Sequence, residues 1–86
     1  MKTIHLKLYG PFRQYIEAPE ITITIQNNSN ATVADLRVEI GKVFQNEKAK
    51  GLLKNSAIAT DSSILQEFEP LGEKSSFALI PPVCGG

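Results

Sequence analysis

The feature that most constrains the fold is an alternation of apolar and polar residues that occurs twice in the first 25 residues. Residues 4–8 read Ile-His-Leu-Lys-Leu, and residues 21–25 read Ile-Thr-Ile-Thr-Ile. A period of two places the apolar side chains on one face of an extended strand, and β-branched residues favour that conformation. Gly10 and Pro11 end the first segment. We therefore expect two strands, most simply paired antiparallel, with one apolar face to bury.

An amphipathic helix follows, and it is the strongest helical signal in the chain. Thr32 is a good N-cap residue, and Asp35 stands three positions later in the style of a capping box, where its charge also suits the helix dipole. The apolar residues after this cap recur on one stripe: Val33, Leu36, Ile40, Val43 and Phe44. We expect the helix to end near residues 45–47 and to pack its stripe across the sheet.

The segment between the first two strands, residues 12–20, is too long for a tight hairpin turn and contains Pro19. It predicts a wide loop instead. Such a loop would return Phe12, Tyr15 or Ile16 to the core.

The second half of the chain predicts shorter elements. Residues 48–56 are compatible with either a helix or a loop. Residues 57–59 predict a short strand, residues 64–68 a brief edge strand or a single helical turn, and residues 77–80 the last strand. The order β-β-α-β-(β)-β predicts an α+β fold: a mixed sheet of four to five strands with one main helix packed across it.

Composition limits the classes of partner and compartment. The 86 residues suffice for one domain, and 9 Lys and Arg balance 9 Asp and Glu without a basic run. Nucleic acid and membranes are therefore not expected as partners. The single cysteine cannot form an internal disulfide, and the first residues lead into a strand rather than into the apolar region of a signal peptide. We expect a cytoplasmic protein.

The last ten residues read as a strand, a stiff spacer and a tail without bulky side chains. Pro81 and Pro82 cannot donate to a sheet ladder, so we place the domain at residues 1–80 and an extended tail at residues 81–86. The Gly-Gly ending admits two interpretations: a terminus that loses order, or a narrow tail whose α-carboxylate is activated inside an enclosing enzyme channel. The Pro-Pro ending of the strand favours the second interpretation.

The chemically active side chains do not suggest an enzyme site. His5 is the only histidine and has no cysteine or carboxylate at ligand spacing, so we expect a solvated strand residue and no metal site. The glycines do not form a phosphate-binding loop. Cys84 could accept sulfur through its thiol. A small residue that fits a narrow channel is the favoured interpretation, because no neighbouring group would activate that thiol.

Three segments together match the pattern of a known family. Residues 79–86 read Leu-Ile-Pro-Pro-Val-Cys-Gly-Gly, residues 8–13 read Leu-Tyr-Gly-Pro-Phe-Arg, and residues 32–36 read Thr-Val-Ala-Asp-Leu. They resemble the tail, the first strand and the helix start of the ubiquitin-like sulfur carriers of the MoaD/ThiS family. The resemblance is strongest to its MoaD branch, the small subunits of molybdopterin synthase. The chain departs from the family pattern at residues 74–76, at Cys84, and at positions 79 and 80, which are often aromatic in MoaD proteins.

The resemblance implies a β-grasp (ubiquitin-like) fold and a carrier that binds no cofactor and is no enzyme on its own. An adenylating, MoeB-like enzyme would use ATP to activate the Gly86 carboxylate, and a persulfide sulfur donor would convert it to a thiocarboxylate. The MoaE-like large subunit of molybdopterin synthase would then direct this sulfur to a pterin precursor in molybdenum cofactor biosynthesis. By the same resemblance, the partner's channel would hold Pro81, Pro82, Val83, Cys84 and Gly85, and the docking surface would comprise Leu79 and Ile80.

Other functions stay open on the sequence alone. A sulfur carrier for thiamin or tRNA thiolation would use the same activated tail, although the Pro-Pro-Val tail favours the pterin pathway. A ubiquitin-like protein modifier would instead join Gly86 to a lysine amine. A binding module with an idle tail would tolerate one additional C-terminal residue, whereas every carboxylate-dependent function would be lost.

Overall fold

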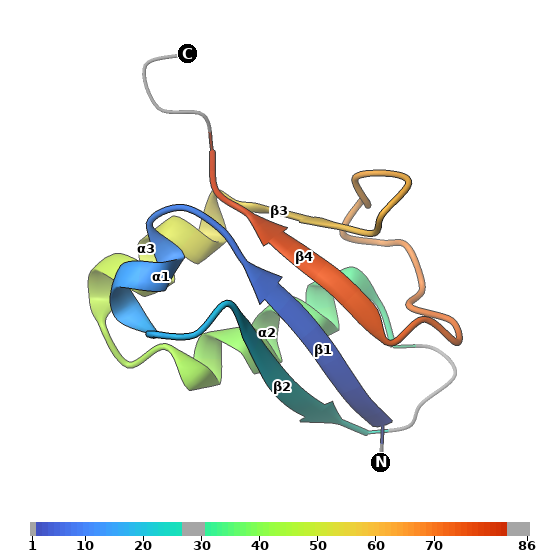
Figure 1. Ribbon diagram of the computed structural model, residues 1–86. Helices are drawn as coiled ribbons and strands as arrows, with labels where there is room; N and C mark the ends of the chain where they lie inside the picture. Colours follow the sequence, from blue (N-terminus) through green and yellow to red (C-terminus); the bar gives the residue numbers. More distant parts are fainter. Residues whose placement is uncertain (1, 27–30, 83–86) are drawn as a thin grey trace.

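The computed structural model describes residues 2–26 and 31–82, which form a four-stranded sheet and three helices (Figure 1). In chain order the elements are β1 (Lys2–Leu8), α1 (Phe12–Tyr15), β2 (Glu20–Ile25), α2 (Val33–Val43), α3 (Glu47–Lys54), β3 (Ala57–Ala59) and β4 (Ser76–Ile80). The predicted mixed sheet with one main helix across it is confirmed. The structure also contains two short helices: α1, which was not predicted, and α3, in the segment that was left open between a helix and a loop.

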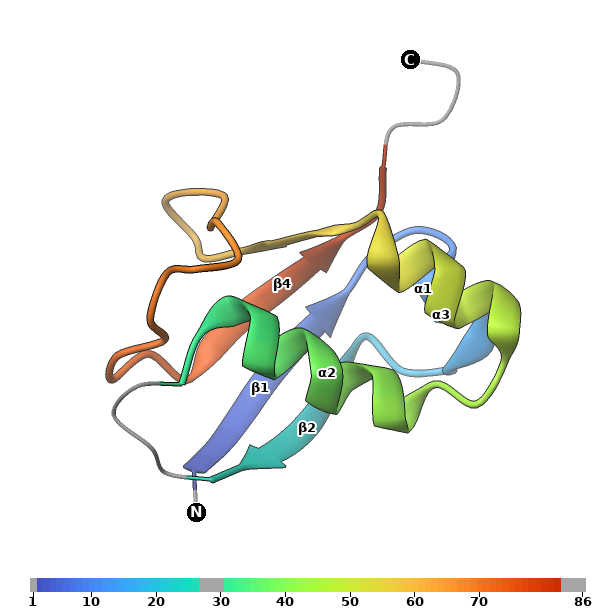
Figure 2. The ribbon, with the colours of Figure 1, turned by 180° about the vertical axis from the view of Figure 1, so that it is seen from behind.

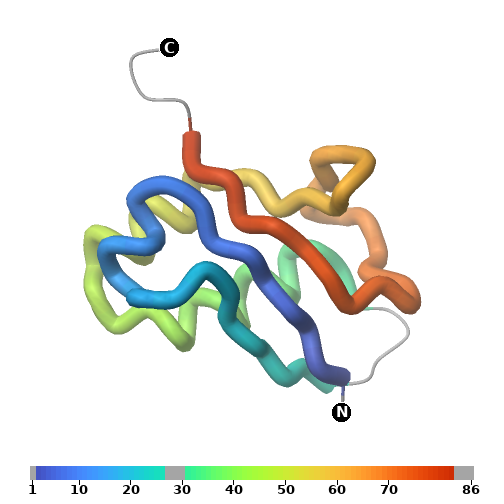
Figure 3. The backbone as a smooth tube through the Cα atoms, in the orientation of Figure 1, coloured from blue at the N-terminus to red at the C-terminus, as the bar shows by residue number. Residues whose placement is uncertain are grey.

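The first and last strands occupy the centre of the sheet, whose order is β2-β1-β4-β3. β2 pairs antiparallel with β1, as predicted, and β3 pairs antiparallel with β4. The two central strands are parallel, with Lys7 opposite Ala78 and Leu8 opposite Leu79. Figure 3 shows β1 and β4 running side by side in the same direction. Parallel strands require a long crossover, and the intervening hairpin strand, helices and β3 provide it.

One face of the sheet is buried beneath α2, which lies behind the strands in Figure 1 and in front of them in Figure 2. The alternation in β1 places Ile4, Leu6 and Leu8 in this core and leaves His5 and Lys7 exposed. Burying an aliphatic side chain of this size contributes roughly 1.5–3 kcal/mol. The helices, β2, β3, β4 and the loops contribute the other buried core residues: Phe12, Ile23, Ile25, Val33, Leu36, Ile40, Phe44, Ala49, Leu53, Ile58, Ala59, Leu71, Phe77 and Leu79.

The start of α2 agrees with the prediction, but its end does not. The Thr32 hydroxyl accepts from the Asp35 N–H at 3.4 Å, and the Asp35 carboxylate accepts from the Thr32 N–H at 2.9 Å, which completes a capping box. The helix ends at Val43 and not at residues 45–47. Val43 is 40% exposed, so the predicted apolar stripe is wrong at this position. Phe44 is buried as predicted, because its extended backbone turns the chain inwards.

The predicted wide loop after β1 contains a helical turn, α1. Phe12 is fully buried, and its ring lies 5.4 Å from the ring of Phe44 between centroids. Ile16 packs partly against the core, whereas Tyr15 is exposed. The expected return of an apolar side chain to the core is therefore confirmed at Phe12.

The segment that the sequence left open, residues 48–56, forms most of α3 and the turn after it. Asn46 is the N-cap, and its side-chain oxygen accepts from the Lys48 N–H at 2.7 Å. Ala49 and Leu53, which stand four positions apart, bury one side of the helix. Their spacing explains why a short, largely polar segment is helical.

The connection from β3 to β4 contains neither a regular strand nor a helix. Ile64 forms an isolated bridge with Ala59, and the Leu65 N–H donates to the Ile58 carbonyl at 2.9 Å. Ile64 and Phe68 are exposed. The prediction of an edge strand or a helical turn over residues 64–68 is therefore wrong.

Arg37 on α2 forms hydrogen bonds that attach the β3–β4 connection to α2 and α3. The Arg37 guanidinium donates to both carboxylate oxygens of Glu67, at 2.8 and 2.7 Å, and to the main-chain oxygen of Leu53 at 2.6 Å. Hydrogen bonding by Arg37, supported by its charge and partly opposed by desolvation, holds the pKa of Glu67 below its ordinary value of 4.5. The group joins α2, the last turn of α3 and the β3–β4 connection.

Candidate functional site

The point at which the chain leaves the sheet is the structural centre of the predicted site. β4 ends at Ile80, immediately before the two prolines, as predicted. Gly10, in the turn after β1, has a φ of +57°, and a Cβ atom at this position would lie 3.2 Å from Cγ of Pro81. The turn after the first strand is therefore packed against the first residue after the last strand. We call Gly10 and Pro81 the exit.

Of the predicted tail residues, the structure describes only the first two. Pro81 is half-buried and Pro82 is exposed. The predicted functional residues Val83, Cys84, Gly85 and Gly86 lie outside the described residues. Their roles stay predictions.

The two residues predicted to form the docking surface lie on opposite faces of β4. Leu79 is completely buried and belongs to the core, so its assignment to a docking surface is wrong. Ile80 is 37% exposed on the other face of the sheet. Adjacent residues of a strand point to opposite faces, so only one of the pair can present its side chain to a partner from the outer face.

A groove on the outer face of the sheet begins beside the exit. Its lining comes from β1, the turn after it, β4 and the turn after β3: Lys7, Tyr9, Ser76, Phe77, Ala78, Ile80, Thr60 and Asp61. We call it the outer-face groove. Tyr9 is 46% exposed, so with Ile80 it presents apolar surface to solvent. Because Lys7 stands opposite Ala78 in the parallel pair, the groove follows the two central strands towards the exit.

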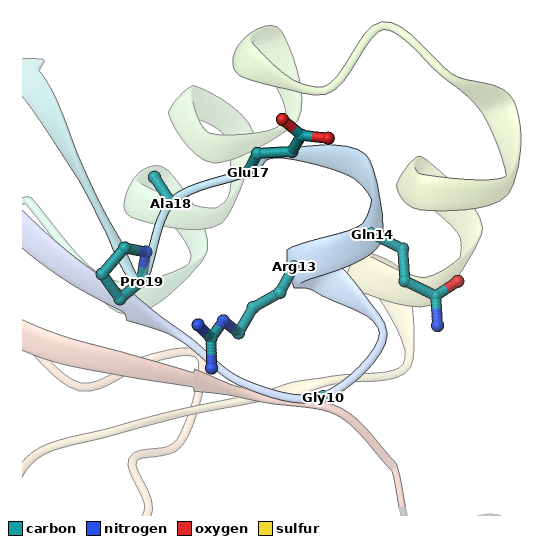
Figure 4. A pocket seen from close by; sticks show the side chains of 6 residues that line it. All are labelled: Gly10, Arg13, Gln14, Glu17, Ala18 and Pro19. Carbon is teal, nitrogen blue, oxygen red and sulfur yellow. The ribbon is translucent and has the colours of Figure 1, made fainter.

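A second hollow lies on the other side of Gly10, between α1 and the segment that leads to β2. It is lined by Gly10, Arg13, Gln14, Glu17, Ala18 and Pro19 (Figure 4). In this view the Arg13 side chain extends from α1 across the hollow, whereas the Glu17 carboxylate points away from it. Arg13 forms no salt bridge within residues 2–26 and 31–82.

His5 lies on the outer face of β1 and is a solvated strand residue, as predicted. Its side chain is 48% exposed, and Nδ1 lies 3.6 Å from a carboxylate oxygen of Glu20 on the neighbouring strand. Throughout the part of the chain that the structure describes, no three His, Cys, Asp or Glu side chains gather as metal ligands. No helix within these described ranges is long and apolar enough to span a membrane.

Together these features form a candidate docking platform beside the exit. Apolar surface from Tyr9 and Ile80 lies on one side of Gly10, and the cation of Arg13 lies on the other. A partner that bound here would enclose the chain directly after the exit. Sequence reasoning missed Tyr9 and Arg13 as surface residues, although the alternation that buries Leu8 implies that Tyr9 points outwards.

The fold and the exit define a class of protein. A mixed sheet with parallel central strands, crossed by one main helix, is the architecture of the ubiquitin-like β-grasp proteins. The sequence profile of the ThiS family matches residues 7–86. The chain belongs to this family, the ubiquitin-fold sulfur carriers of the ThiS/MoaD type, whose members act as carriers and not as catalysts.

Solved structures share the fold over nearly the whole chain. Molybdopterin converting factor subunit 1 from Pyrococcus furiosus is 23% identical, with 96% of this chain and 100% of that chain covered and a TM-score of 0.72. Small archaeal modifier protein 1 from Haloferax volcanii is 14% identical, with the same two coverages and the same TM-score. A chain in the complex of subunits 1 and 2 of molybdopterin-converting factor from Helicobacter pylori 26695 is 27% identical, with 98% and 99% covered and a TM-score of 0.59. No curated protein matches this chain.

Proposed function

We propose that this protein is the small, sulfur-carrying subunit of a molybdopterin synthase and that its Gly86 carboxylate is the group that carries sulfur. One observation carries the proposal. The family match continues to residue 86, whereas the last strand ends at Ile80. The family pattern therefore extends beyond the last strand that the structure describes, as expected if the residues after it perform the reaction.

The chemistry proceeds in three steps on partner proteins. In the first, a carboxylate oxygen of Gly86 attacks the α-phosphorus of ATP, pyrophosphate leaves, and an acyl-adenylate forms on the activating enzyme. In the second, a persulfide sulfur attacks the acyl carbon and AMP leaves. A thiol then cleaves the resulting acyl disulfide by exchange and releases the thiocarboxylate. The described residues contribute position: Pro81 packs against Gly10, and Pro82 has a fixed φ.

The outer-face groove and Arg13 serve as the docking surface in this proposal. Burial of Tyr9 and Ile80 by a partner would remove apolar surface from water directly beside the exit. The Helicobacter pylori structure, a complex of subunits 1 and 2 of molybdopterin-converting factor, supports a large subunit as this partner. That subunit would accept the tail and direct the sulfur to the pterin precursor.

Reconstitution tests the proposal in stages. The protein is incubated with ATP, an adenylating enzyme, a persulfide donor and a thiol, and then with the large subunit and the pterin precursor. We expect a thiocarboxylate at Gly86 and then the dithiolene product, and neither should form with a chain extended by one residue after Gly86. Ile80→Asp should reduce kcat/KM for transfer by at least about tenfold through weaker docking, whereas Val38→Asp should not. Val38 is a matched control because it is 61% exposed on α2, across the core from the groove.

The outcomes separate the alternatives. Absence of any thiocarboxylate would refute the carrier function. A thiocarboxylate that forms but does not reach the pterin would refute the molybdopterin assignment and favour thiamin or tRNA thiolation. Capture of activated Gly86 by lysine amines, visible as conjugates on a reducing denaturing gel, would indicate a protein modifier.

A further inference from the structure

The two edge strands of the sheet, β3 at one margin and β2 at the other, differ in whether another described segment bonds to their outer side. At the β3 margin the strand has three residues, and the following connection bonds back to it through the Leu65 N–H and the Ile58 carbonyl at 2.9 Å. At the other margin β2 has six residues and pairs with β1 on one side only. Figures 1 and 2 show β2 along one side of the sheet. A second strand could therefore be added at β2 but not at β3.

The backbone of β2 presents hydrogen-bonding groups outwards at every second residue. The Leu8 N–H donates to the Pro19 carbonyl at 2.9 Å, which identifies this pair as hydrogen-bonded in the antiparallel ladder. Because such pairs alternate, Ile21, Ile23 and Ile25 exchange bonds with β1, and the N–H and C=O groups of Glu20, Thr22 and Thr24 point away from the sheet. Within residues 2–26 and 31–82 no other segment bonds these outward groups.

The margin lacks the features that usually prevent edge pairing. Exposed edges are commonly blunted by lysine, proline, a bulge or short length. β2 reads Glu-Ile-Thr-Ile-Thr-Ile, without Lys, Pro or Gly, and its register with β1 is regular over all six residues. Its one charge, Glu20, stands at the start of the strand beside His5. Ile21 is only half-buried, so apolar surface is also present at this edge.

We propose that β2 pairs antiparallel with β2 of a second copy of this chain, about a two-fold axis at Ile23. This register places Thr22 opposite Thr24 of the other copy and Glu20 opposite Gln26, so no like charges face each other. On the core side, Ile21 packs against Ile25 of the other copy, so its exposed apolar area decreases. Both faces of the strand thus match an inverted copy of themselves, which favours a second copy over an unrelated peptide.

The arrangement leaves the docking platform accessible on both copies. A two-fold axis perpendicular to the sheet keeps the two outer faces on the same side and reverses the strand direction. The outer-face grooves, on β1 and β4, then lie on one common face, and the two exits point in opposite directions. The dimer presents two independent exits, and its existence does not depend on what the tail carries.

The register gives a sharp test by sedimentation equilibrium and by the amide NMR spectrum between about 10 µM and 1 mM, the range expected for a small interface. We expect reversible dimers, with concentration-dependent shifts for the amides of Glu20, Thr22 and Thr24 and not for those of Ile21 and Ile23. Thr22→Lys with Thr24→Lys should weaken dimerisation roughly tenfold or more by placing like charges opposite each other.

Two variants complete the test. Thr22→Lys with Thr24→Glu places opposite charges face to face in this register and should keep the dimer. Thr3→Lys adds a charge on the same outer face but on the central strand, and should also keep it. A protein that stays monomeric to 1 mM would overturn the proposal, as would a dimer that the two-lysine variant does not weaken. Loss of the dimer in the lysine–glutamate variant would overturn the register.

Discussion

Replacing Arg37 by methionine, which keeps much of the aliphatic stem but removes the guanidinium, should lower the free energy of unfolding by about 2 kcal/mol. The Arg37 side chain is only 18% exposed. Its guanidinium joins three segments that are distant in sequence: α2, the main-chain oxygen of Leu53 in α3, and Glu67 in the β3–β4 connection. Removal of this one group therefore weakens the attachment of the connection and of α3 to α2.

The magnitude follows from the two sets of bonds. The ion pair with Glu67 is bidentate, but Glu67 is 51% exposed, so solvent screening limits its contribution to about 0.5 kcal/mol. A hydrogen bond from a charged donor contributes about 1.5–3 kcal/mol. The Leu53 carbonyl also accepts from the Ser56 N–H at 3.1 Å and keeps that partner in the variant, so the lower end, about 1.5 kcal/mol, applies.

Urea unfolding followed by circular dichroism measures this difference directly. For a domain of this size, about 2 kcal/mol corresponds to a decrease in Tm of roughly 8–16 °C. Arg13→Met is the matched control: Arg13 is exposed and forms no salt bridge with any described residue, so its loss should change stability by less than about 0.5 kcal/mol. Equal unfolding free energies for the two variants would refute the role assigned to Arg37.

The remaining predictions concern titration, capping and glycine. Because the pKa of Glu67 is lowered in the folded state, the ionised carboxylate raises the free energy of unfolding above about pH 4.5, and this contribution is lost as the pH falls. The difference in unfolding free energy between wild type and Glu67→Gln should therefore shrink at low pH, as measured by urea titrations at several pH values. Thr32→Ala should cost about 1 kcal/mol through loss of the N-cap, measured by the same unfolding assay. Gly10→Ala should destabilise by about 1–2 kcal/mol because of its positive φ and the nearby Pro81, whereas Gly51→Ala in α3 should stabilise by about 0.5–1 kcal/mol. A Gly10→Ala variant that is more stable than the Gly51→Ala variant would contradict the close packing of Gly10 against Pro81 at the exit.

The parts of the fold that were predictable depend on local, repeated signals. The alternation in β1 and β2 and the Thr32–Asp35 capping box determine structure within a few residues, and the structure contains both. Val43 illustrates the limit. An ideal helical stripe includes it, but α2 ends at this residue and the extended backbone of Phe44 directs only the next side chain into the core.

The sequence did not predict α1 and left α3 open between a helix and a loop, because tertiary contacts stabilise both helices. α1 is one turn whose Phe12 packs on Phe44, and this partner lies far away in the sequence. α3 had a readable N-cap at Asn46, but Gly51 within it lowered the helical signal. Neither helix has enough residues to be stable alone, so sequence periodicity is a weak guide to both.

The site was partly predictable for the same reason. The strand end at Ile80 followed from the two prolines. The alternation rule, if applied to residues 77–80, also separates Leu79 from Ile80, so the error in the docking surface was avoidable. The contact between Gly10 and Pro81 was not predictable, because it depends on the parallel pairing of the first and last strands.

The central claim is that Gly86 carries sulfur, and the intact mass of the protein isolated from its own host without oxidants tests it most directly. We expect a species in which one terminal oxygen is replaced by sulfur, localised to Gly86 by fragmentation and retained in a Cys84→Ala variant. A homogeneous carboxylate, still unmodified after incubation with ATP, the cognate activating enzyme and a sulfur donor, would contradict it.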